Sequence, residues 1–263
     1  MGRAWFAGAI LAGTAAIAPT GAGATVGEDA FSMPAITSAI WMGDSLAFEQ
    51  APGVQAALES AGLAFSTYAY PGVSLSGDAW LTKGETWLYD HHEPLLAATD
   101  ADVVIWQLSR FDTISPPDIL LLTHTTFVDM ALRNHQAVVF VTAPPVADSA
   151  LMVLGEDWEA LTDAASRVAE RHPGRVFVVD SVGAWGTEFV GQAPDGTAIR
   201  KPDGVHICPL GARMFADFLV RWLADHFAGL QPTDASAWPQ DWWDDDRYDR
   251  PAGSCDPRPP TDG

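Results

Sequence analysis

The sequence predicts an α/β fold in three layers, α/β/α, with a five-stranded parallel sheet at the centre. Apolar runs of strand length alternate with amphipathic helical patterns along most of the chain. This alternation is typical of a parallel sheet that is covered by helices on both faces. The 263 residues, of which 48% are hydrophobic, are enough for one domain with a sizeable core.

Five strands are expected, and each is a short apolar run bounded by turn residues. They cover residues 35–42, 63–70, 102–108, 137–142 and 176–179. The helical patterns cover residues 49–61, 80–98, 116–134, 156–172 and 209–227. Gly62, Pro173 and Gly229 end three of these helices. A long loop from residue 180 to residue 203 lies between the last strand and the last helix.

The chain is strongly acidic, with 34 Asp and Glu against 14 Lys and Arg and a formal net charge of −20. Nucleic acid and anionic membrane surfaces both repel such a protein. The composition therefore argues against these partners. It leaves a neutral small-molecule or glycan substrate open, and it does not reveal an oligomeric state.

The first 24 residues have the pattern of a secretory signal peptide. Arg3 forms the positive segment, residues 4–18 are apolar, and Ala22-Gly23-Ala24 provides a small-residue cleavage site. We expect cleavage near Ala24 and a secreted or extracytoplasmic protein with no membrane domain. An uncleaved anchor is the alternative. Residues 25–34 then form a lead-in to the first strand.

A serine follows the first strand, in Gly43-Asp44-Ser45-Leu46. A serine between a strand and a helix can face a cleft, with its backbone N–H free to bind an anion. Ser45 is therefore a candidate nucleophile. The alternative is a plain strand-to-helix turn with Asp44 or Ser45 as the helix N-cap.

An Asp-x-x-His pattern near the other end of the α/β region supplies possible partners for that serine. His206 is a candidate general base, and Asp203 is close enough in sequence to fix its tautomer and stabilise its charged form. Taken alone, such a pattern is usually a surface loop. Together, Ser45, Asp203 and His206 predict a catalytic triad.

These blocks together resemble the SGNH/GDSL hydrolase family. Within it, the chain is similar to secreted bacterial SGNH esterases and to SGNH modules fused to membrane O-acyltransferases. Four segments carry the resemblance, which covers roughly residues 36–228: Met42-Gly43-Asp44-Ser45-Leu46-Ala47, Tyr70-Pro71-Gly72-Val73-Ser74, Leu108-Ser109-Arg110-Phe111-Asp112 and Asp203-Gly204-Val205-His206. The resemblance implies a flavodoxin-like SGNH hydrolase fold, here in a domain spanning residues 35–229.

The resemblance also implies an oxyanion hole, to which the N–H of Ser45 contributes. Gly72 matches the family's glycine after the second strand, and Gly77 is the rival. The alternative is that both are turn glycines that supply positive φ.

The block after the third strand departs from the family, because the usual Gly-x-Asn-Asp lacks its Asn here. Arg110 falls at or beside that position and could donate to the oxyanion instead, while Gln107 is a weaker candidate. The alternative is a surface Arg110 paired with Asp112.

The resemblance implies no metal and no organic cofactor. His91 and His92 are adjacent in a helical pattern and should point to different sides, which argues against a metal site there.

Residues 230–263 form an acidic tail rich in Pro and Trp. It carries Trp238, Trp242 and Trp243 around an Asp run, so part of it should pack on the domain, or contact sugar or another surface. Cys208 and Cys255 are the only cysteines, and an even count in an oxidising compartment predicts a disulfide that tethers the tail. Two free thiols are the alternative.

The resulting functional prediction is a secreted SGNH-type serine esterase. It would hydrolyse a small acyl ester, with O-acetyl on a carbohydrate as the foremost example, through an acyl-Ser45 intermediate. One alternative is an O-acyltransferase acting on a cell-surface or extracellular glycan. The other is a non-catalytic glycan-binding module that uses the tail tryptophans as a stacking surface.

Overall fold

A five-stranded, all-parallel sheet organises the chain, as predicted. The strands are β1 (Ser38–Gly43), β2 (Ala64–Ala69), β3 (Val103–Gln107), β4 (Ala137–Val141) and β5 (Val176–Val179), in the spatial order β2-β1-β3-β4-β5. The computed structural model describes residues 34–76, 88–148, 158–249 and 253–255, all within a unit that spans residues 33–263. The predicted signal peptide and the lead-in up to residue 33 lie outside the described residues.

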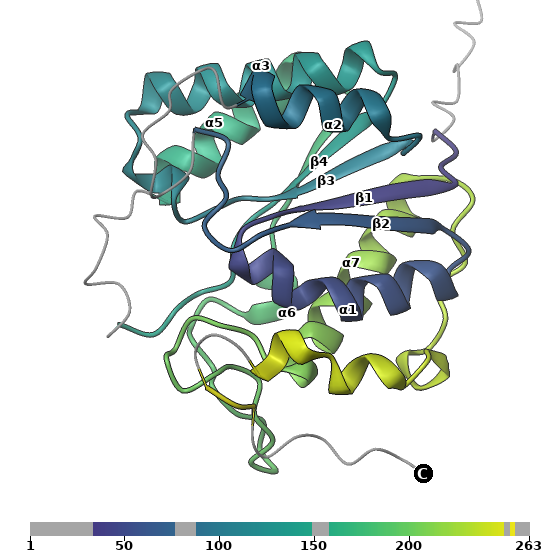
Figure 1. Cartoon of the computed structure of the whole chain (residues 1–263), viewed down its shortest axis with the longest axis vertical. Helices are drawn as coiled ribbons and strands as arrows, with labels where there is room; N and C mark the ends of the chain where they lie inside the picture. Colours follow the sequence, from purple (N-terminus) through teal and green to yellow (C-terminus); the bar gives the residue numbers. More distant parts are fainter. Residues whose placement is uncertain (1–33, 77–87, 149–157, 250–252, 256–263) are drawn as a thin grey trace, which may run out of the picture. The chain divides into compact units, whose positions relative to one another are not determined.

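Helices cover both faces of the sheet (Figure 1). On one face lie α1 (Ser45–Ser60), α6 (Val182–Trp185) and α7 (Pro209–His226). On the other lie α2 (Glu93–Ala98), α3 (Pro117–Arg133) and α5 (Trp158–Arg171). Each face has its own cluster of buried apolar side chains, because residues alternate between the two sides of β1, β3 and β4. The three-layer prediction is therefore confirmed.

The chain order changes direction beside β1, and this fixes where a site can form. β2 pairs with one edge of β1 and β3 with the other. The carboxyl ends of β1 and β3 lie at this switch point, which is where open parallel sheets bind ligands. The turns that follow these two strands are therefore brought side by side.

Helix α1 begins at Ser45, four residues before the predicted start. The Asp44 carboxylate accepts a hydrogen bond from the Leu46 N–H at 2.9 Å, so it caps the helix and allows it to begin at once after β1. The predicted long loop also contains a short helix, α6. Part of the predicted helix 80–98 lies outside the described residues, and its described part is a π-helical turn, Leu88–His92, followed by α2.

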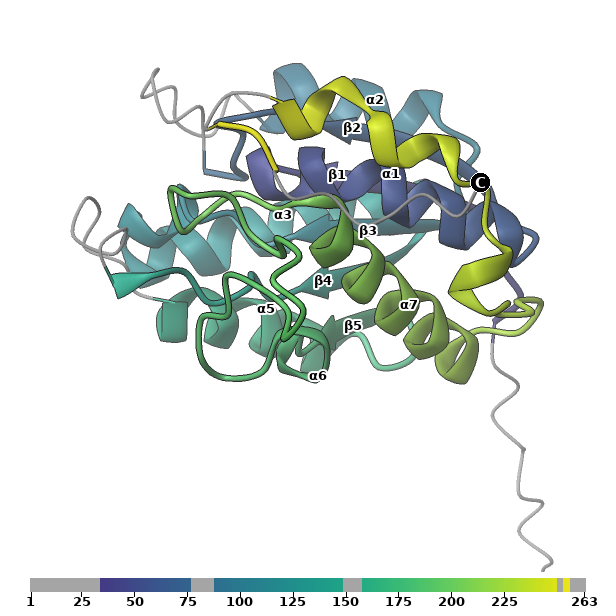
Figure 2. The same ribbon diagram turned by 90° about the horizontal axis from the view of Figure 1, so that it is seen from below.

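The tail folds back onto the domain as three short 3₁₀ turns, Ala235–Ala237, Asp241–Asp244 and Asp246–Asp249, and the last two contact α1 (Figure 2). Trp238, Trp242 and Trp243 are only 2%, 8% and 5% exposed and belong to the core cluster on the α1 side. A stacking surface made by these tryptophans is therefore wrong. Cys208 and Cys255 form the predicted disulfide, which fixes the tail at Cys255 beside the start of α7.

Among the described helices, none combines the length and the apolar character that crossing a membrane requires.

Candidate active site

Ser45 is half-buried at the first position of α1, directly after β1. Gly43 precedes this turn with φ of +144°. A Cβ on Gly43 would lie 2.7 Å from Ala47 Cβ and 3.0 Å from Gln107 O, so only glycine fits between α1 and the end of β3. The motif is thus a capped strand-to-helix turn, and it also places Ser45 at the edge of the sheet where ligands bind.

Asp44 ties this turn to the turn that follows β3. Its buried carboxylate accepts hydrogen bonds from the Leu46 N–H at 2.9 Å, from Ser109 Oγ at 3.0 Å and from the Arg110 backbone. Burial raises the pKa of Asp44 to about 6, and these hydrogen bonds oppose the rise. Because the Arg110 backbone bonds to Asp44, it is held next to the Ser45 turn. Arg110 as a whole is half-buried.

Asp112 ties the loop after β2 to the same place. This carboxylate is fully buried and accepts from the Leu75 N–H at 3.1 Å, the Ser76 N–H at 2.8 Å and Ser76 Oγ at 2.6 Å. Asp112 is therefore not at the surface, and this contradicts the exposed position that the alternative gives to its pair with Arg110.

Gly72 lies in the same loop, is buried, and has φ of +85°. This backbone conformation requires glycine, as the turn-glycine alternative expected. Its place in the oxyanion hole remains a prediction. Gly77, the rival, lies outside the described residues.

His206 and Asp203 share one closed turn. Lys201 N–H donates to His206 O at 2.8 Å and closes it. Within it, Asp203 Oδ1 accepts from the N–H groups of Val205 and His206 at 3.0 and 3.1 Å. Asp203 Oδ2 lies 2.5 Å from His206 Nδ1. The carboxylate therefore fixes the backbone of the turn and the orientation of the ring together.

The electrostatics of this pair favour a charged Asp203 and a basic His206. Burial alone would raise the pKa of Asp203, but the hydrogen bonds from His206 and the turn backbone outweigh burial and lower it to about 2. For His206, burial acts to lower the pKa, and the bond to Asp203 and the charge of Glu49 outweigh it and raise the pKa. The result is a histidine whose basicity is increased by its neighbours.

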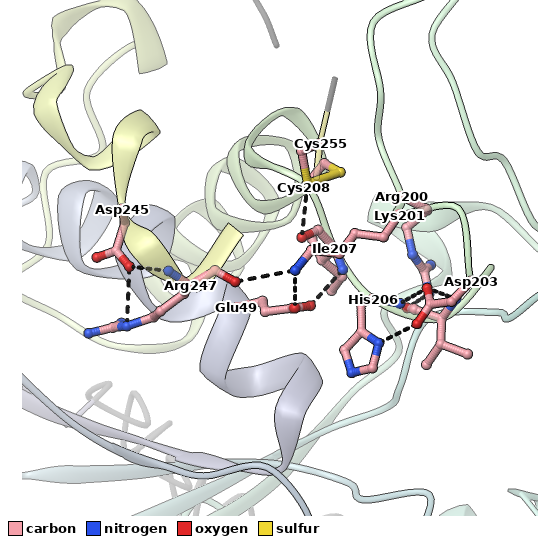
Figure 3. Close-up of polar contacts among 11 residues, drawn as sticks. Glu49, Arg200, Lys201, Asp203, His206, Ile207, Cys208, Asp245, Arg247 and Cys255 are labelled. Carbon is pink, nitrogen blue, oxygen red and sulfur yellow. Dashed lines mark hydrogen bonds and ion pairs between the residues drawn. A yellow bond between two sulfur atoms is a disulfide. The ribbon is translucent and has the colours of Figure 1, made fainter. Parts of the chain in front are cut away.

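Glu49 connects this turn to the helix that Ser45 begins (Figure 3). Its Oε1 lies 2.7 Å from Lys201 Nζ, and its Oε2 accepts from the Ile207 N–H at 2.7 Å. Because Glu49 is four residues after Ser45, the two lie on the same face of α1. The structure thus brings the His206 turn against the first turns of the Ser45 helix.

Comparison with known proteins rests on structure, since no protein-family model and no curated protein sequence matches the chain. The inhibitor-bound aryl esterase of M. smegmatis is 18% identical with a TM-score of 0.54, and the match covers 73% of this chain and 100% of that chain. A carbohydrate acetylesterase from Sinorhizobium meliloti is 20% identical with a TM-score of 0.54, over 72% and 99%. A protein classed as an SGNH hydrolase from Slackia heliotrinireducens is 19% identical with a TM-score of 0.51, over 70% and 96%.

The chain has the SGNH hydrolase fold. The sequence identities are low, so the likeness concerns the fold, and the chemistry must be argued from this chain's own residues.

A cavity of about 620 Å³ opens beside the His206 turn of this SGNH fold, at the carboxyl end of β4. Its lining combines two aromatic side chains with hydroxyl and carboxyl groups: Thr142, Ala143, Pro144, Pro145, Val146, Ala147, Asp148, Trp158, Thr162, Thr187, Glu188 and Phe189. Ala147 N–H donates to Gly204 O at 2.9 Å, so one wall of the cavity is bonded to the turn that carries His206. The volume is in the range that holds a small organic ligand.

Arg200 fixes the same wall from the inside. Its guanidinium donates to Pro145 O at 2.9 Å and to Val205 O, and it lies over the rings of Trp185 and Phe189 at 5.4 and 5.5 Å. Burial lowers the pKa of Arg200 to about 10, and the charge of Asp203 opposes this. Arg200 therefore acts as a cationic clamp between the β4 loop and the His206 turn.

Within the part of the chain that the structure describes, no group of three or more His, Cys, Asp or Glu side chains is arranged to hold a metal ion. His91 is exposed, whereas His92 is buried against Trp106 and Phe127. The two rings therefore point to different sides, as expected.

Sequence reasoning missed the supports of the site: Asp44 as a bridge, Ser109, Asp112 as an anchor, Glu49, Arg200 and Lys201. Ser109 and Asp112 lie in one of the four segments that carry the family resemblance, so the sequence does signal that they lie near the candidate site. Glu49 and Lys201 had none, because isolated charged residues in an amphipathic pattern are typical of a solvated surface.

Proposed function

We propose that this protein is a serine ester hydrolase of the SGNH type that acts on a small acyl ester. The observation that carries the proposal is the Asp203–His206 pair, joined at 2.5 Å and bonded through Glu49 to the helix that begins at Ser45. A nucleophile, a base and a group that orients the base are the minimum set for acyl transfer through serine.

In the proposed reaction, Ser45 Oγ attacks the carbonyl carbon of the ester while His206 Nε2 takes the serine proton. The His206 Nδ1–H remains bonded to Asp203, which stabilises the imidazolium. Collapse of the tetrahedral intermediate transfers that proton to the departing alcohol and leaves an acyl-Ser45 ester. Water, activated by the same histidine, then releases the carboxylic acid and restores Ser45. This chemistry uses no metal or organic cofactor.

The developing oxyanion would be held by the N–H groups of Ser45 and Gly72, with Arg110 in the place of the absent Asn. Ser45 lies at a helix N-terminus, where backbone N–H groups favour negative charge. Each such donor contributes about 3–4 kcal/mol to lowering the barrier. Asp44 and Asp112 support these donors by fixing the turns after β1, β2 and β3 relative to one another.

An O-acetylated carbohydrate is the substrate we infer. The cavity beside the His206 turn presents Trp158 and Phe189 next to Asp148, Thr162 and Glu188. Aromatic faces pack on the C–H side of a sugar ring, while hydroxyl and carboxyl groups bond its hydroxyls. The likeness in fold to a carbohydrate acetylesterase supports this inference, and a neutral glycan is compatible with the net charge of −20.

An extracytoplasmic location completes the proposal. The signal-peptide pattern of residues 1–24 and the Cys208–Cys255 disulfide both support it. The two observations are independent, since one is a targeting pattern and the other is a bond that persists in oxidising compartments.

The proposal is tested with a fluorophosphonate probe and a chromogenic acetyl ester, using the mature protein and Ser45→Ala. We expect covalent labelling and ester hydrolysis for the native chain and neither for the variant. Adding an oligosaccharide acceptor separates hydrolase from transferase, because acceptor-dependent acyl transfer that outruns hydrolysis would identify an O-acyltransferase. Absence of both labelling and hydrolysis in the native chain would overturn the enzymatic proposal in favour of a binding module.

A further inference from the structure

We propose that Glu49 is a positioning residue that holds both ends of the His206 turn against the Ser45 helix and thereby sets the approach of His206 to Ser45. This inference rests on the proposed function of Ser45 and His206. It assigns a role in that reaction to a residue that belongs to neither the triad nor the oxyanion hole.

The geometry is that of a two-point clamp. The turn begins at Lys201 and ends at His206, and the Lys201 N–H bonded to His206 O closes it. One oxygen of Glu49 binds Lys201 Nζ at the start, and the other binds the N–H of Ile207 just after the end, both at 2.7 Å (Figure 3). A single carboxylate on α1 therefore fixes the position of both ends of the turn.

The burial of the Glu49–Lys201 pair indicates that the pair contributes to the positions of the groups around it more than to the free energy of unfolding. The side chains of Glu49 and Lys201 are 1% and 0% exposed. Taking both charges out of water costs about as much as their attraction returns, and an apolar pair of similar size would often be equally stable. An apolar pair could not fix the Ile207 N–H, and it would leave that donor unsatisfied. The ion pair supplies a directional contact where the two halves of the site meet.

The charge of Glu49 also acts on His206. Glu49 raises the pKa of His206 more than Lys201 lowers it. Burial raises the pKa of Glu49 itself to about 7, opposed by the charges of His206 and Lys201. Further charged groups packed around this network are Asp44 at the N-cap of α1, Arg200 and Asp203 beside or in the turn, and Arg247 on the tail.

The tail also contacts the Glu49–Lys201 pair, through a backbone carbonyl. Lys201 Nζ donates to Arg247 O at 3.2 Å, while the Arg247 guanidinium lies 5.1 Å from the Phe48 ring centroid, beside Asp245. The ammonium is thus bound on one side by Glu49 and on the other by the tail. This second partner makes Lys201 a link between α1, the turn and the tail.

The test compares Glu49→Gln/Lys201→Met with the native mature protein. The double variant keeps an acceptor for the Ile207 N–H and leaves no unpaired ammonium in the interior, so it should fold. We expect kcat to fall by about 10- to 100-fold, with KM within about 2-fold. The acid limb of the kcat/KM profile should move to lower pH, and the His206 ring should titrate at lower pH by NMR, with His206→Ala identifying its signals.

Glu49→Asp separates position from charge. It keeps the negative charge but is one methylene too short to bind Lys201 and Ile207 together. We expect a similar loss of kcat with the acid limb in its native place.

Val168→Ala, a buried truncation in α5 on the opposite face of the sheet, is the control for loss of stability alone. It should lower the melting temperature without changing kcat or the acid limb of the kcat/KM profile. Native kcat and a native His206 titration in the double variant would overturn the inference, as would equal kinetic losses in Val168→Ala. If instead Ser45→Ala retains activity, the proposed function itself has failed, so the two failures are distinguishable.

Discussion

The two halves of the candidate site are built in different ways. Ser45, Gly72 and Arg110 lie in turns after three neighbouring strands, and the buried carboxylates of Asp44 and Asp112 join these turns through backbone N–H and hydroxyl groups. The His206 turn belongs to no strand of the main sheet. It is held from outside, by Glu49 from α1, by the Arg200 contact with the β4 loop and by the disulfide to the tail.

This difference indicates which half is adaptable. The Ser45 half is fixed by sheet register, since β1 is paired with β2 on one side and β3 on the other. The His206 half depends on a few long-range contacts, each of which can be removed singly. We therefore expect changes in the Ser45 half to alter chemistry at constant structure, and changes around His206 to alter position.

The largest effect is expected for Ser45→Ala. Loss of the nucleophile should lower kcat by about 10⁴- to 10⁶-fold, and the melting temperature should stay within a few degrees because the side chain is small and only half-buried. Initial rates on a chromogenic acetyl ester and a thermal melt measure both. Adding His206→Ala should cost little more, since the two residues act as one unit. Independent multiplication of the two losses would contradict a shared mechanism.

Asp203→Asn tests the His206 half and should rank next, with a loss in kcat of about 10²- to 10⁴-fold. The pKa of His206 is raised above its ordinary value of 6.5 in the native protein. The neutral form of His206, which acts as the base, is therefore lost as the pH falls through this raised pKa. Asparagine removes the charge and should move this acid limb to lower pH.

Asp203→Asn should also change how the free energy of unfolding depends on pH, and the sign of the change follows from the pKa shifts of the pair. The folded pKa of Asp203 is depressed to about 2, so its contribution to stability is present above pH 4 and is lost as pH falls toward 2. His206 behaves in the opposite sense: its contribution is complete below its unfolded pKa and is lost as pH rises through its raised folded pKa. Thermal melts from pH 2 to pH 9 measure both. If Asp203→Asn leaves both the acid limb of the pH–rate profile and the pH dependence of stability unchanged, the assignment of Asp203 as the partner of His206 is contradicted.

The Ser45 half of the candidate site could be predicted from the sequence, because its signals are local. Apolar runs fix the strands, and their carboxyl ends in a parallel sheet must lie at one edge, so the sequence predicts that the turns carrying Ser45, Gly72 and Arg110 lie at that edge. The turn of Asp203 and His206 was found through its own short pattern. Its supports were not, because Glu49 and Lys201 are 152 residues apart and nothing in either neighbourhood marks them as buried.

The packing of the tail could not be fully predicted from the sequence, for the same reason. Its composition indicated packing, but not which surface its tryptophans would cover. The burial of Trp238, Trp242 and Trp243 against the α1 side depends on shape that only the assembled helices provide. The disulfide, in contrast, needed only a count of two cysteines and an expected compartment.

Arg110→Ala sharpens the chemistry of the Ser45 half and should have a smaller effect. If Arg110 replaces the absent Asn as an oxyanion donor, kcat should fall by about 10²- to 10³-fold with a smaller change in KM. A raised KM with native kcat would instead indicate that Arg110 binds an acidic part of the substrate. Native values of both constants would remove it from the site. Arg110→Lys is the matched control, since it keeps the charge and loses the planar guanidinium.

The smallest effect on chemistry is expected when the tail is released from the His206 half. Cys208 is at the N-cap position of α7, two residues after His206, and its bond to Cys255 closes a segment of 47 residues. The chain-entropy model gives about 4 kcal/mol for a loop of this length. The real loss should be smaller, because Trp238, Trp242, Trp243 and Tyr248 remain packed in the core without the bond.

Mild reduction, or Cys208→Ala with Cys255→Ala, should therefore lower the melting temperature while the domain stays folded. Activity should fall only several-fold, because Glu49 and Arg200 still hold the turn. Loosening of the tail should also weaken the Arg247 contact to Lys201, so the loss should appear in kcat before the domain unfolds. Peptide mapping under non-reducing conditions verifies the bond, and the double alanine variant, insensitive to reductant, is the control. A loss of activity that coincides with global unfolding would show that the tail supports the fold and does not adjust the position of His206.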